Sequence, residues 1–418
     1  MFIITLKESS SLKSYQNVLD QVLTILDNED QFLSNIGQYF TAYLNDKTAM
    51  ELNNHPLVEY IEEDSKIYLQ RKLYKEDKNR NYIMKNPYEI ESEPESIYNG
   101  RFLIQNSADW GLSKIVESKN SEYEYFENGG EDVNIYVLDT GIDLGHSEFK
   151  NDDKRTVSYG GNFTDEPDQD KNGHGTHIAG IIGGSSTGIA RSANMISVKI
   201  INKNGEGKAS SFLKALHYVI NEHNSIIKKT GKIPKTILNA SVAGEKSYAI
   251  NHAIRKAANT YKIHIAVAAG NSRTDSCTFS PGSADLAVTV GAIDEEDKIA
   301  KFSNTGNCVD IYAPGVLIKS AYPLKINNSK SVISNLFSNI RLLFHYFTGN
   351  SESYQVLSGT SMATPHVTGV LAVYLSLTDF TPEELKLQIL EDSRQITTKH
   401  GNFSIISLKK LYKRLKKI

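Results

Sequence analysis

The stretch VNIYVLDTG at residues 133–141 decides how this chain is interpreted. Its first seven residues form a near-continuous apolar run that ends at Asp139, which is typical of a strand buried in a parallel sheet. Ligand sites of such sheets form at the carboxyl ends of the strands. The carboxylate of Asp139 is therefore expected to be half-buried and to reach into a cleft.

The alternation of strand and helix continues from about residue 105 onward. Further strands are predicted at 194–200, 235–241 and 263–269. Helical patterns lie between the strands, at 174–183, 211–223 and 248–261. Apolar strands that alternate with helices indicate an α/β fold with a mostly parallel sheet, covered by helices on both faces.

Two further motifs each open a predicted helix: NGHGTH at 172–177 and GTSMATPH at 359–366. His174, at a helix start, would be held firmly and face the cleft. Ser361, at a helix N-terminus, would gain from the helix dipole when an oxyanion forms beside it. Pro365 is tolerated because the first helical turn needs no internal N–H donor. Asp139, His174 and Ser361 thus suit the roles of orienting group, base and nucleophile in acyl transfer.

The segments VLDTGID, NGHGTHIAG, AVAAGN and LSGTSMATPHVTG strongly resemble the subtilisin-like serine proteases. The chain order Asp, His, Ser is that of subtilisin. SCTFSPGSADLAVTVGAID and CVDIYAPGV are similar to the proteinase K and cerevisin branch. The resemblance covers roughly residues 105–395, and it implies a subtilisin-like catalytic domain over 105–418 that hydrolyses peptide bonds through an acyl-enzyme.

The resemblance assigns roles to individual residues. It implies that Asp139 orients His174, that His174 is the general base and then the acid, and that Ser361 is the nucleophile. Asn271, in the segment AVAAGN, matches the oxyanion-hole asparagine. Its amide and the backbone N–H of Ser361 would stabilise the tetrahedral oxyanion.

Two segments match the strands with which the family binds extended peptide substrates. They are Ser241-Val242-Ala243-Gly244 and Gly205-Glu206-Gly207, which would hold a substrate between them by strand addition. The family usually has Gly-Gly where this chain has Ala243-Gly244. The extra methyl group is expected either to restrict which substrate side chains fit directly before the cleaved bond, or to slow the enzyme. The pocket segments carry no obvious acidic floor, although Glu245 is close, which favours a broad or apolar preference there.

Residues 1–70 are predicted to form a small α+β unit, with a strand at 2–6, a helix at 11–26 and a closing strand at 58–69. This unit resembles the family's propeptide, which acts as an intramolecular chaperone and inhibitor. Residues 71–104 are charged and rich in Asn, as expected for an exposed linker that contains the maturation site. The resemblance thus implies a zymogen that cuts itself.

Two C-terminal features lie outside these motifs. An insert at 325–350 carries a helical apolar pattern at 332–347, which predicts a surface helix or, alternatively, a membrane-interface or substrate-binding element. A basic helix is expected over 405–418, and six basic residues occur in 408–418. It is interpreted as a solvated helix or as a surface for anionic lipid.

Calcium is the only metal that the resemblance suggests. Asp310 matches a calcium-ligand aspartate of the proteinase K group, and the other ligands would be backbone carbonyls of Asp285 and Ala287. The alternative is that Asp310 forms a turn or an ion pair. No catalytic metal is expected, because His174 and His177 lack a third ligand motif nearby.

Composition limits the remaining classes. The net charge of −3 over 418 residues gives no reason to expect nucleic acid, and no apolar run reaches the ~18 residues of a membrane span. Cys277 and Cys308 could form one bridge or stay free. A monomer is expected. The family implies a secreted, vacuolar or lysosomal location. Because no clear signal peptide is seen, an intracellular location also stays open. A catalytically silent homologue, or one that cleaves only itself and then regulates a partner, is the alternative to a general protease.

Overall fold

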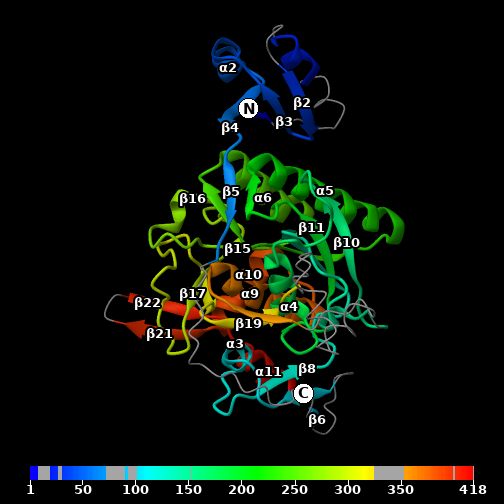
Figure 1. Cartoon of the computed structure of the whole chain (residues 1–418), viewed down its shortest axis with the longest axis vertical. Helices are drawn as coiled ribbons and strands as arrows, with labels where there is room; N and C mark the ends of the chain where they lie inside the picture. The colour runs from blue at the N-terminus through cyan, green and yellow to red at the C-terminus, as the bar shows by residue number, and fades with distance from the viewer. Residues whose placement is uncertain are drawn as a thin grey trace, which may run out of the picture.

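The computed structural model describes residues 1–7, 19–26, 31–71, 90–92, 101–151, 153–323, 353–398 and 401–417. It contains a small N-terminal unit that stands on a larger one (Figure 1). The small unit lies above α5 (Ala209–Thr230) and α6 (Tyr248–Tyr261) of the larger unit, and strand β5 (Lys66–Leu69) runs down from it into the larger unit.

The small unit is built on a four-stranded antiparallel sheet with the order β2-β3-β1-β4. Its elements are β1 (Phe2–Leu6), β2 (Gln31–Ile36), β3 (Tyr39–Tyr43), α2 (Asp46–Asn53) and β4 (Val58–Glu63). Ile4, Phe40 and Leu52 are fully buried in its core. The strand predicted at 2–6 is present; of the helix predicted at 11–26, only residues from 19 onward are described, and 19–23 are helical.

The closing strand predicted at 58–69 is wrong as a single element. The chain turns at Asp64 and Ser65, so that β4 pairs with β1 inside the small unit, whereas β5 pairs with two strands of the larger unit. The polar run EEDSK at 62–66 marks the turn, but it does not show that the two strands belong to different sheets.

The larger unit is organised around a nine-stranded, mainly parallel sheet. Across the sheet the strands are β10 (Val157–Asn162), β11 (Asn194–Lys199), β9 (Val133–Asp139), β13 (Lys235–Ala240), β15 (His264–Ala268), β17 (Val288–Ile293), β18 (Ile311–Pro314), β22 (Gly401–Ile405) and β21 (Arg394–Thr398). All neighbours are parallel except the final pair, β22 and β21. The predicted fold class is confirmed.

Helices cover both faces of this sheet, and β9 shows the division. Ile135 and Val137 lie in the core beneath α4 (His174–Gly183) and α9 (Thr360–Leu377), whereas Tyr136 and Leu138 lie in the core beneath α5 and α6. This alternation follows from the two-residue repeat of a strand and explains why the strand sequence is almost wholly apolar. The other helices are α3 (Trp110–Ile115), α10 (Pro382–Asp392) and α11 (Lys409–Leu415), with short 3-10 turns η1 (Ser147–Phe149) and η2 (Ser276–Thr278).

Three smaller sheets complete the described part of the chain. They are β12 (Glu206–Lys208) and β14 (Val242–Glu245) with β5 and β16 (Phe279–Ser280); the hairpin β19 (Ile318–Ala321) and β20 (Tyr354–Leu357); and β6 (Ile90–Ser92), β7 (Phe102–Gln105) and β8 (Tyr123–Phe126). The predicted domain boundary at 104/105 needs a correction, because strand β7 of the larger unit already begins at Phe102. The ring of Phe102 is buried, and its centroid lies 5.0 Å from that of the Tyr412 ring near the C-terminus.

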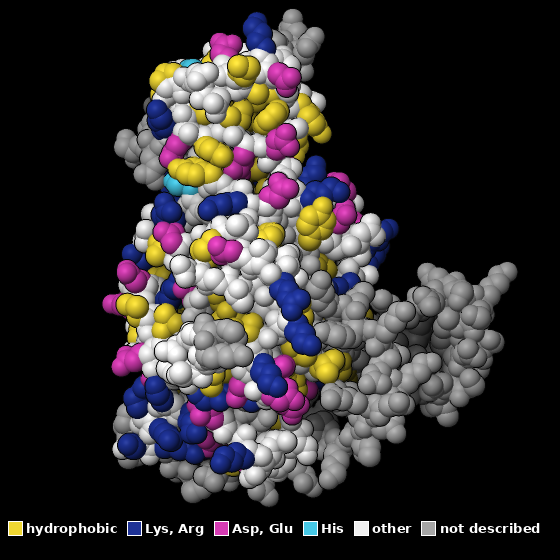
Figure 2. Space-filling view, turned by 90° about the vertical axis from the view of Figure 1, so that its left-hand side faces the viewer, with side chains coloured by type: hydrophobic (Ala, Val, Ile, Leu, Met, Phe, Trp, Pro, Cys, Tyr) yellow, Lys and Arg dark blue, Asp and Glu magenta, His cyan; other side chains and the backbone are white. Residues whose placement is uncertain are grey.

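The C-terminal segment is shorter than the helix predicted over 405–418, because Ile405 ends β22 and α11 begins at Lys409. Basic side chains gather toward the lower end of the face in Figure 2. Lys409 and Arg414 of α11, and Lys416 directly after it, each pair with an acidic residue. Their charges are therefore partly neutralised within the chain.

Two further observations concern the cysteines and membrane spans. Cys277 and Cys308 form a disulfide. Among the described residues, no helix has the length and apolar character that crossing a membrane requires. The insert predicted at 325–350 lies outside the described residues.

The central position of β13 can be tested by a core substitution. Ile237→Ala is expected to lower the free energy of unfolding by about 2–5 kcal/mol, because the fully buried side chain leaves a cavity in the core beneath α4 and α9. The same change at Ile233, which is 67% exposed, should cost less than about 0.5 kcal/mol. Urea unfolding of Ser361→Ala chains, followed by the fluorescence of the single Trp110, measures both; equal midpoints would contradict this packing.

Candidate active site

Asp139 and His174 form a buried pair at the carboxyl edge of the sheet. Nδ1 of His174 donates to Oδ1 of Asp139 over 2.7 Å, and both side chains are fully buried. The backbone N–H of Thr140 donates to the same carboxylate oxygen over 2.8 Å. Nε2 of His174 is buried without a hydrogen-bond partner among the described residues. This pairing leaves Nε2 as the ring nitrogen that can accept a proton.

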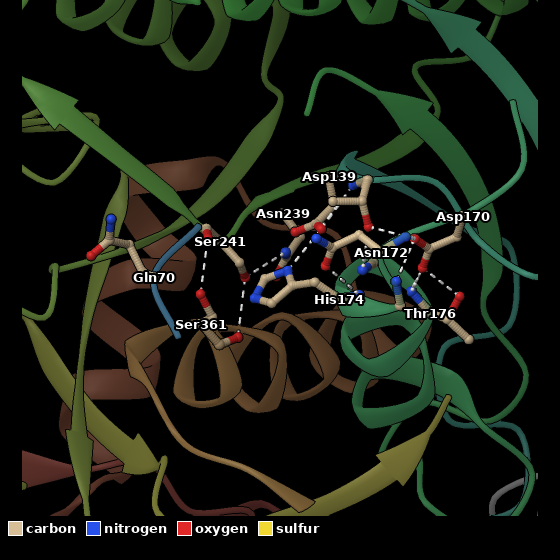
Figure 3. A network of polar contacts seen from close by, with 12 residues as sticks. Gln70, Asp139, Asp170, Asn172, His174, Thr176, Asn239, Ser241 and Ser361 are labelled. Carbon is tan, nitrogen blue, oxygen red and sulfur yellow. Dashed lines mark hydrogen bonds and ion pairs between the residues drawn. The ribbon is translucent and has the colours of Figure 1, made fainter. Parts of the chain in front are cut away.

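The loop before His174 is held by a second buried carboxylate, that of Asp170 (Figure 3). Asp170 accepts hydrogen bonds from the backbone N–H groups of Gly173 and Thr176, at 2.7 and 2.9 Å. It also accepts from the hydroxyls of Thr176 and Thr140, at 2.7 and 2.8 Å. Because these donors belong to the first turn of α4 and to the residue after Asp139, Asp170 fixes the two members of the pair relative to each other.

Ser361 is the second residue of α9, and it faces the same site. Figure 3 shows His174 between Asp139 on one side and Ser361 and Ser241 on the other. The hydroxyl of Ser361 donates to the backbone carbonyl of Ser241 over 2.9 Å, and the Ser241 hydroxyl donates back to the Ser361 carbonyl over 3.1 Å. The hydroxyl of Ser361 is therefore not hydrogen-bonded to Nε2 of His174 in this structure.

Asn271, shortly after β15, presents a free amide group to this site. Its Oδ1 accepts from the backbone N–H and the hydroxyl of Thr360, at 2.9 and 3.0 Å. Its Nδ2 is buried without a hydrogen-bond partner among the described residues. The orientation of the side chain is thus fixed by Thr360, while its donor remains available.

The carbonyl group of Gln70 lies where these donors meet. The backbone N–H of Ser361 donates to the oxygen of Gln70 over 3.1 Å. A Cβ atom on Gly359 would lie 2.1 Å from that oxygen and 3.1 Å from Nδ2 of Asn271, so only glycine permits this approach. The peptide bond between Gln70 and Arg71 is therefore held beside Ser361.

Strand β5 reaches this position by pairing antiparallel with β12 on one side and β14 on the other. Tyr68 lies opposite both Glu206 and Ala243, and Leu69 lies opposite Val242. The N–H groups of Leu69 and Gln70 donate to Gly205 and Ser241, each over 3.3 Å. The two segments predicted to bind substrate therefore both contact residues 66–70.

The side chain of Ile67 is buried in this cleft, with 1% exposure. It lies opposite Gly207 and Gly244, and a Cβ on Gly244 would come within 2.6 Å of the Lys66 carbonyl. Glycine on the cleft strand thus makes room for the approaching chain, while Ile67 joins the apolar core beneath α5 and α6. The cleft therefore holds an apolar side chain of the chain itself at this position.

The side chain of Gln70 meets backbone groups rather than charges. Its Oε1 accepts from the backbone N–H of Asn271 over 3.0 Å, and its Nε2 donates to the carbonyl of Tyr68 over 3.1 Å.

Glu245 is exposed, and its backbone lies opposite Phe279 in the neighbouring strand β16. The methyl group of Ala243 is buried in the middle of β14.

The predicted calcium ligands also lie together, but they surround an ammonium group. Nζ of Lys386 contacts Oδ1 of Asp310 and the carbonyls of Asp285 and Ala287 at 2.8, 3.0 and 2.8 Å. A positive charge that already bonds all three oxygens does not fit a bound calcium ion.

His177 is fully buried, and its Nε2 lies between the carbonyls of Ile318 and Gln355. Burial lowers the pKa of His177 to about 3.

Sequence analysis missed four residues of the site: Gln70, Asp170, Thr360 and Lys386. Asp170 and Thr360 could have been found, because Thr360 lies inside one motif already singled out and Asp170 lies two residues before another. Gln70 and Lys386 carry no local signal, since their contacts depend on strand addition and on packing between distant segments.

Comparison with known proteins agrees with this geometry. A profile of the subtilase family, peptidase family S8, matches residues 130–405. A subtilisin-like proteinase of Encephalitozoon cuniculi is 30% identical, over 93% of this chain and 84% of that protein. Subtilisin-like serine protease Rho m 2.0101 of Rhodotorula mucilaginosa is 37% identical, over 67% of this chain and 75% of that one. The crystal structure of a cold-adapted subtilisin-like serine proteinase superimposes with a TM-score of 0.59 and 31% identity, over 72% of this chain and 98% of that one.

The chain belongs to the subtilase family. It is a subtilisin-like serine endopeptidase, with the subtilisin-like fold built on a mainly parallel sheet.

The contacts of Asp170 predict that it positions His174. Asp170→Asn should lower kcat by about 10²-fold with little change in KM, because an amide nitrogen cannot accept from Thr176 and a small displacement of the base is costly. Asp165→Asn, at an exposed position of the same loop, is the matched control. Steady-state kinetics on a peptide substrate measures both; an unchanged kcat in Asp170→Asn would contradict the role.

Proposed function

We propose that this endopeptidase is made as a self-processing precursor, and that it cleaves its own chain between Gln70 and Arg71. One observation carries the proposal: the N–H of Ser361 donates to the carbonyl oxygen of Gln70 while β5 is paired on both edges. This is the arrangement that an acyl-transfer enzyme needs for the bond that it attacks.

In the proposed reaction, Ser361 attacks the carbonyl carbon of Gln70. The hydroxyl proton moves to Nε2 of His174, and a bond forms between Oγ and the carbon. The C–N bond to Arg71 then breaks, and the departing amine takes the proton from Nε2. Water next gives its proton to His174 and attacks the ester, which releases the carboxylate of Gln70 and returns the proton to Ser361.

Asp139 and Asn271 would support these steps. Asp139 accepts from Nδ1 of His174 and so leaves Nε2 unprotonated; its negative charge would then stabilise the imidazolium. The unpartnered Nδ2 of Asn271 and the N–H of Ser361 would stabilise the oxyanion that forms on the carbonyl oxygen.

Residues 1–70 are proposed to act as the inhibitor and folding chaperone of the enzyme. Besides β5, two acidic residues at the end of β4 cap helices of the larger unit. Glu62 accepts from the N–H of Tyr248 over 2.9 Å, and Asp64 accepts from the N–H and hydroxyl of Ser210 at 2.8 and 2.7 Å. A carboxylate that caps a helix N-terminus typically stabilises the folded state by roughly 0.5–2 kcal/mol.

External substrates are proposed to be extended peptides that take the place of β5. The burial of Ile67 favours an apolar side chain four residues before the cleaved bond, counting the Gln70 position as the first. The uncharged surroundings of Gln70 favour an uncharged side chain there. The Cys277–Cys308 disulfide supports an oxidising compartment, such as the secretory pathway or a vacuole.

Self-cleavage predicts a defined mass change. The full-length chain, after folding, should yield fragments 1–70 and 71–418, whereas Ser361→Ala should stay whole because it lacks the nucleophile. Intact-mass spectrometry of both preparations measures this. Because residues 1–70 are proposed to stay bound as an inhibitor, they are then digested with an immobilised protease that is removed afterwards. An unrelated extended protein, such as denatured casein, is added to the remaining 71–418 fragment to follow turnover.

Three other outcomes would contradict parts of the proposal. Cutting at another bond would reject the Gln70–Arg71 assignment. A wild-type chain that folds but stays whole would favour the catalytically silent alternative. A chain that cuts itself but leaves casein intact even after residues 1–70 have been removed would favour a self-cleaving regulator.

Loss of the Asn271 amide should slow processing strongly. Asn271→Leu removes an oxyanion donor, and such a loss typically lowers the rate by about 10²–10³-fold. The first-order disappearance of the full-length chain on gels gives this rate without needing mature enzyme. Asn259→Leu, at an exposed position of α6, is the matched control and should process at the parent rate.

A further inference from the structure

We propose that the ammonium group of Lys386 takes the place of a calcium ion. It binds the three oxygens that the family resemblance suggested as calcium ligands, those of Asp310, Asp285 and Ala287. The stability of this part of the catalytic unit would then be independent of calcium. The inference concerns the side chain of α10 and does not depend on self-processing.

The geometry matches the three hydrogens of an ammonium group. Nζ of Lys386 contacts Asp310 Oδ1 at 2.8 Å, the Ala287 carbonyl at 2.8 Å and the Asp285 carbonyl at 3.0 Å. A lysine ammonium has three N–H donors and no acceptor, so these contacts satisfy it completely. The distances are those of hydrogen bonds, whereas calcium binds oxygen at about 2.3–2.6 Å.

The charges are also balanced without a metal. The side chains of Lys386 and Asp310 are 17% and 19% exposed, so the pair is largely shielded from water. Burial raises the pKa of Asp310, and the neighbouring ammonium opposes this rise. The second oxygen of Asp310 accepts from the N–H of Thr289 over 2.8 Å. A divalent cation brought to these oxygens would be repelled by the ammonium.

Among the described residues, no cluster of carboxylates surrounds this place. The ion takes about six to eight oxygens, usually including several carboxylates. The carboxylate of Asp285 pairs instead with Arg255, at 3.3 Å. Within the described ranges, no group of three or more His, Cys, Asp or Glu side chains could hold a metal.

The contact joins three parts of the catalytic unit. Asp285 and Ala287 lead into β17, Asp310 leads into β18, and Lys386 belongs to α10. Asp310 also follows Cys308, whose disulfide partner Cys277 lies in the loop after Asn271. Lys386 therefore fixes the entry to two neighbouring strands, and through the disulfide it supports the loop that carries the oxyanion donor.

The experiment uses the full-length Ser361→Ala chain, which cannot digest itself, and measures its thermal unfolding in EDTA and in millimolar calcium. We expect the same Tm in both solutions. Lys386→Met keeps the aliphatic stem but removes the charge, and it should lower Tm in EDTA by roughly 2–8 °C. Lys410→Met, an exposed lysine that bonds one backbone carbonyl, is the matched control and should leave Tm unchanged.

Asp310→Asn provides a second test that does not require the Lys386 variant to fold. If calcium raises the Tm of the parent chain and this rise is lost in Asp310→Asn, these oxygens bind calcium and the proposal is rejected. A Lys386→Met chain that unfolds at the parent temperature in EDTA also rejects it. In a double-mutant cycle, we expect the loss in Lys386→Met to be smaller when Asp310 is already Asn, because the two side chains act on each other.

Discussion

The active site depends on the shared direction of three neighbouring strands, β9, β13 and β15. Because they run parallel, their carboxyl ends meet at one edge, where Asp139 ends β9, Ser241 follows β13 and Asn271 follows β15. Parallel strands must be joined by crossovers, and helices on both faces provide them. His174 and Ser361 come from the N-termini of two such helices, so that one sheet edge collects every group that the proposed reaction uses.

The cleft adds a second requirement, which is backbone pairing. β12 and β14 present hydrogen-bonding edges toward each other across a gap of one strand, and β5 fills that gap. Backbone edges recognise any extended chain, so they bind without regard to sequence. Side-chain contacts add to this pairing, above all the burial of Ile67. The same geometry thus suits both a broad protease and an inhibitor that belongs to the same chain.

The sequence predicted well those parts that are local. Asp139, His174 and Ser361 lie in short motifs whose strand or helix start is encoded in adjacent residues, and the helices at 174–183 and 248–261 are observed with the predicted limits. The prediction was wrong for 58–69, because the division between β4 and β5 depends on partners far along the chain. Lys386 was missed for the same reason: it comes within bonding distance of Asp310 only when α10 lies beside the segments that lead into β17 and β18. The Cys277–Cys308 bridge was left open, since spacing alone does not tell how close two cysteines lie.

The way in which β5 is bound also explains how a cleaved propeptide would remain an inhibitor. The ladder contacts of β5 with β12 and β14 come from residues before the proposed cleavage bond, so cutting after Gln70 removes none of them. The cut converts the Gln70 carbonyl into a carboxylate, and a charged acceptor strengthens the hydrogen bond from the N–H of Ser361. The helix caps of Glu62 and Asp64 remain as well. Hydrolysis alone therefore does not open the cleft, and the release of activity in the proposed mechanism requires a later step that unfolds or digests residues 1–70.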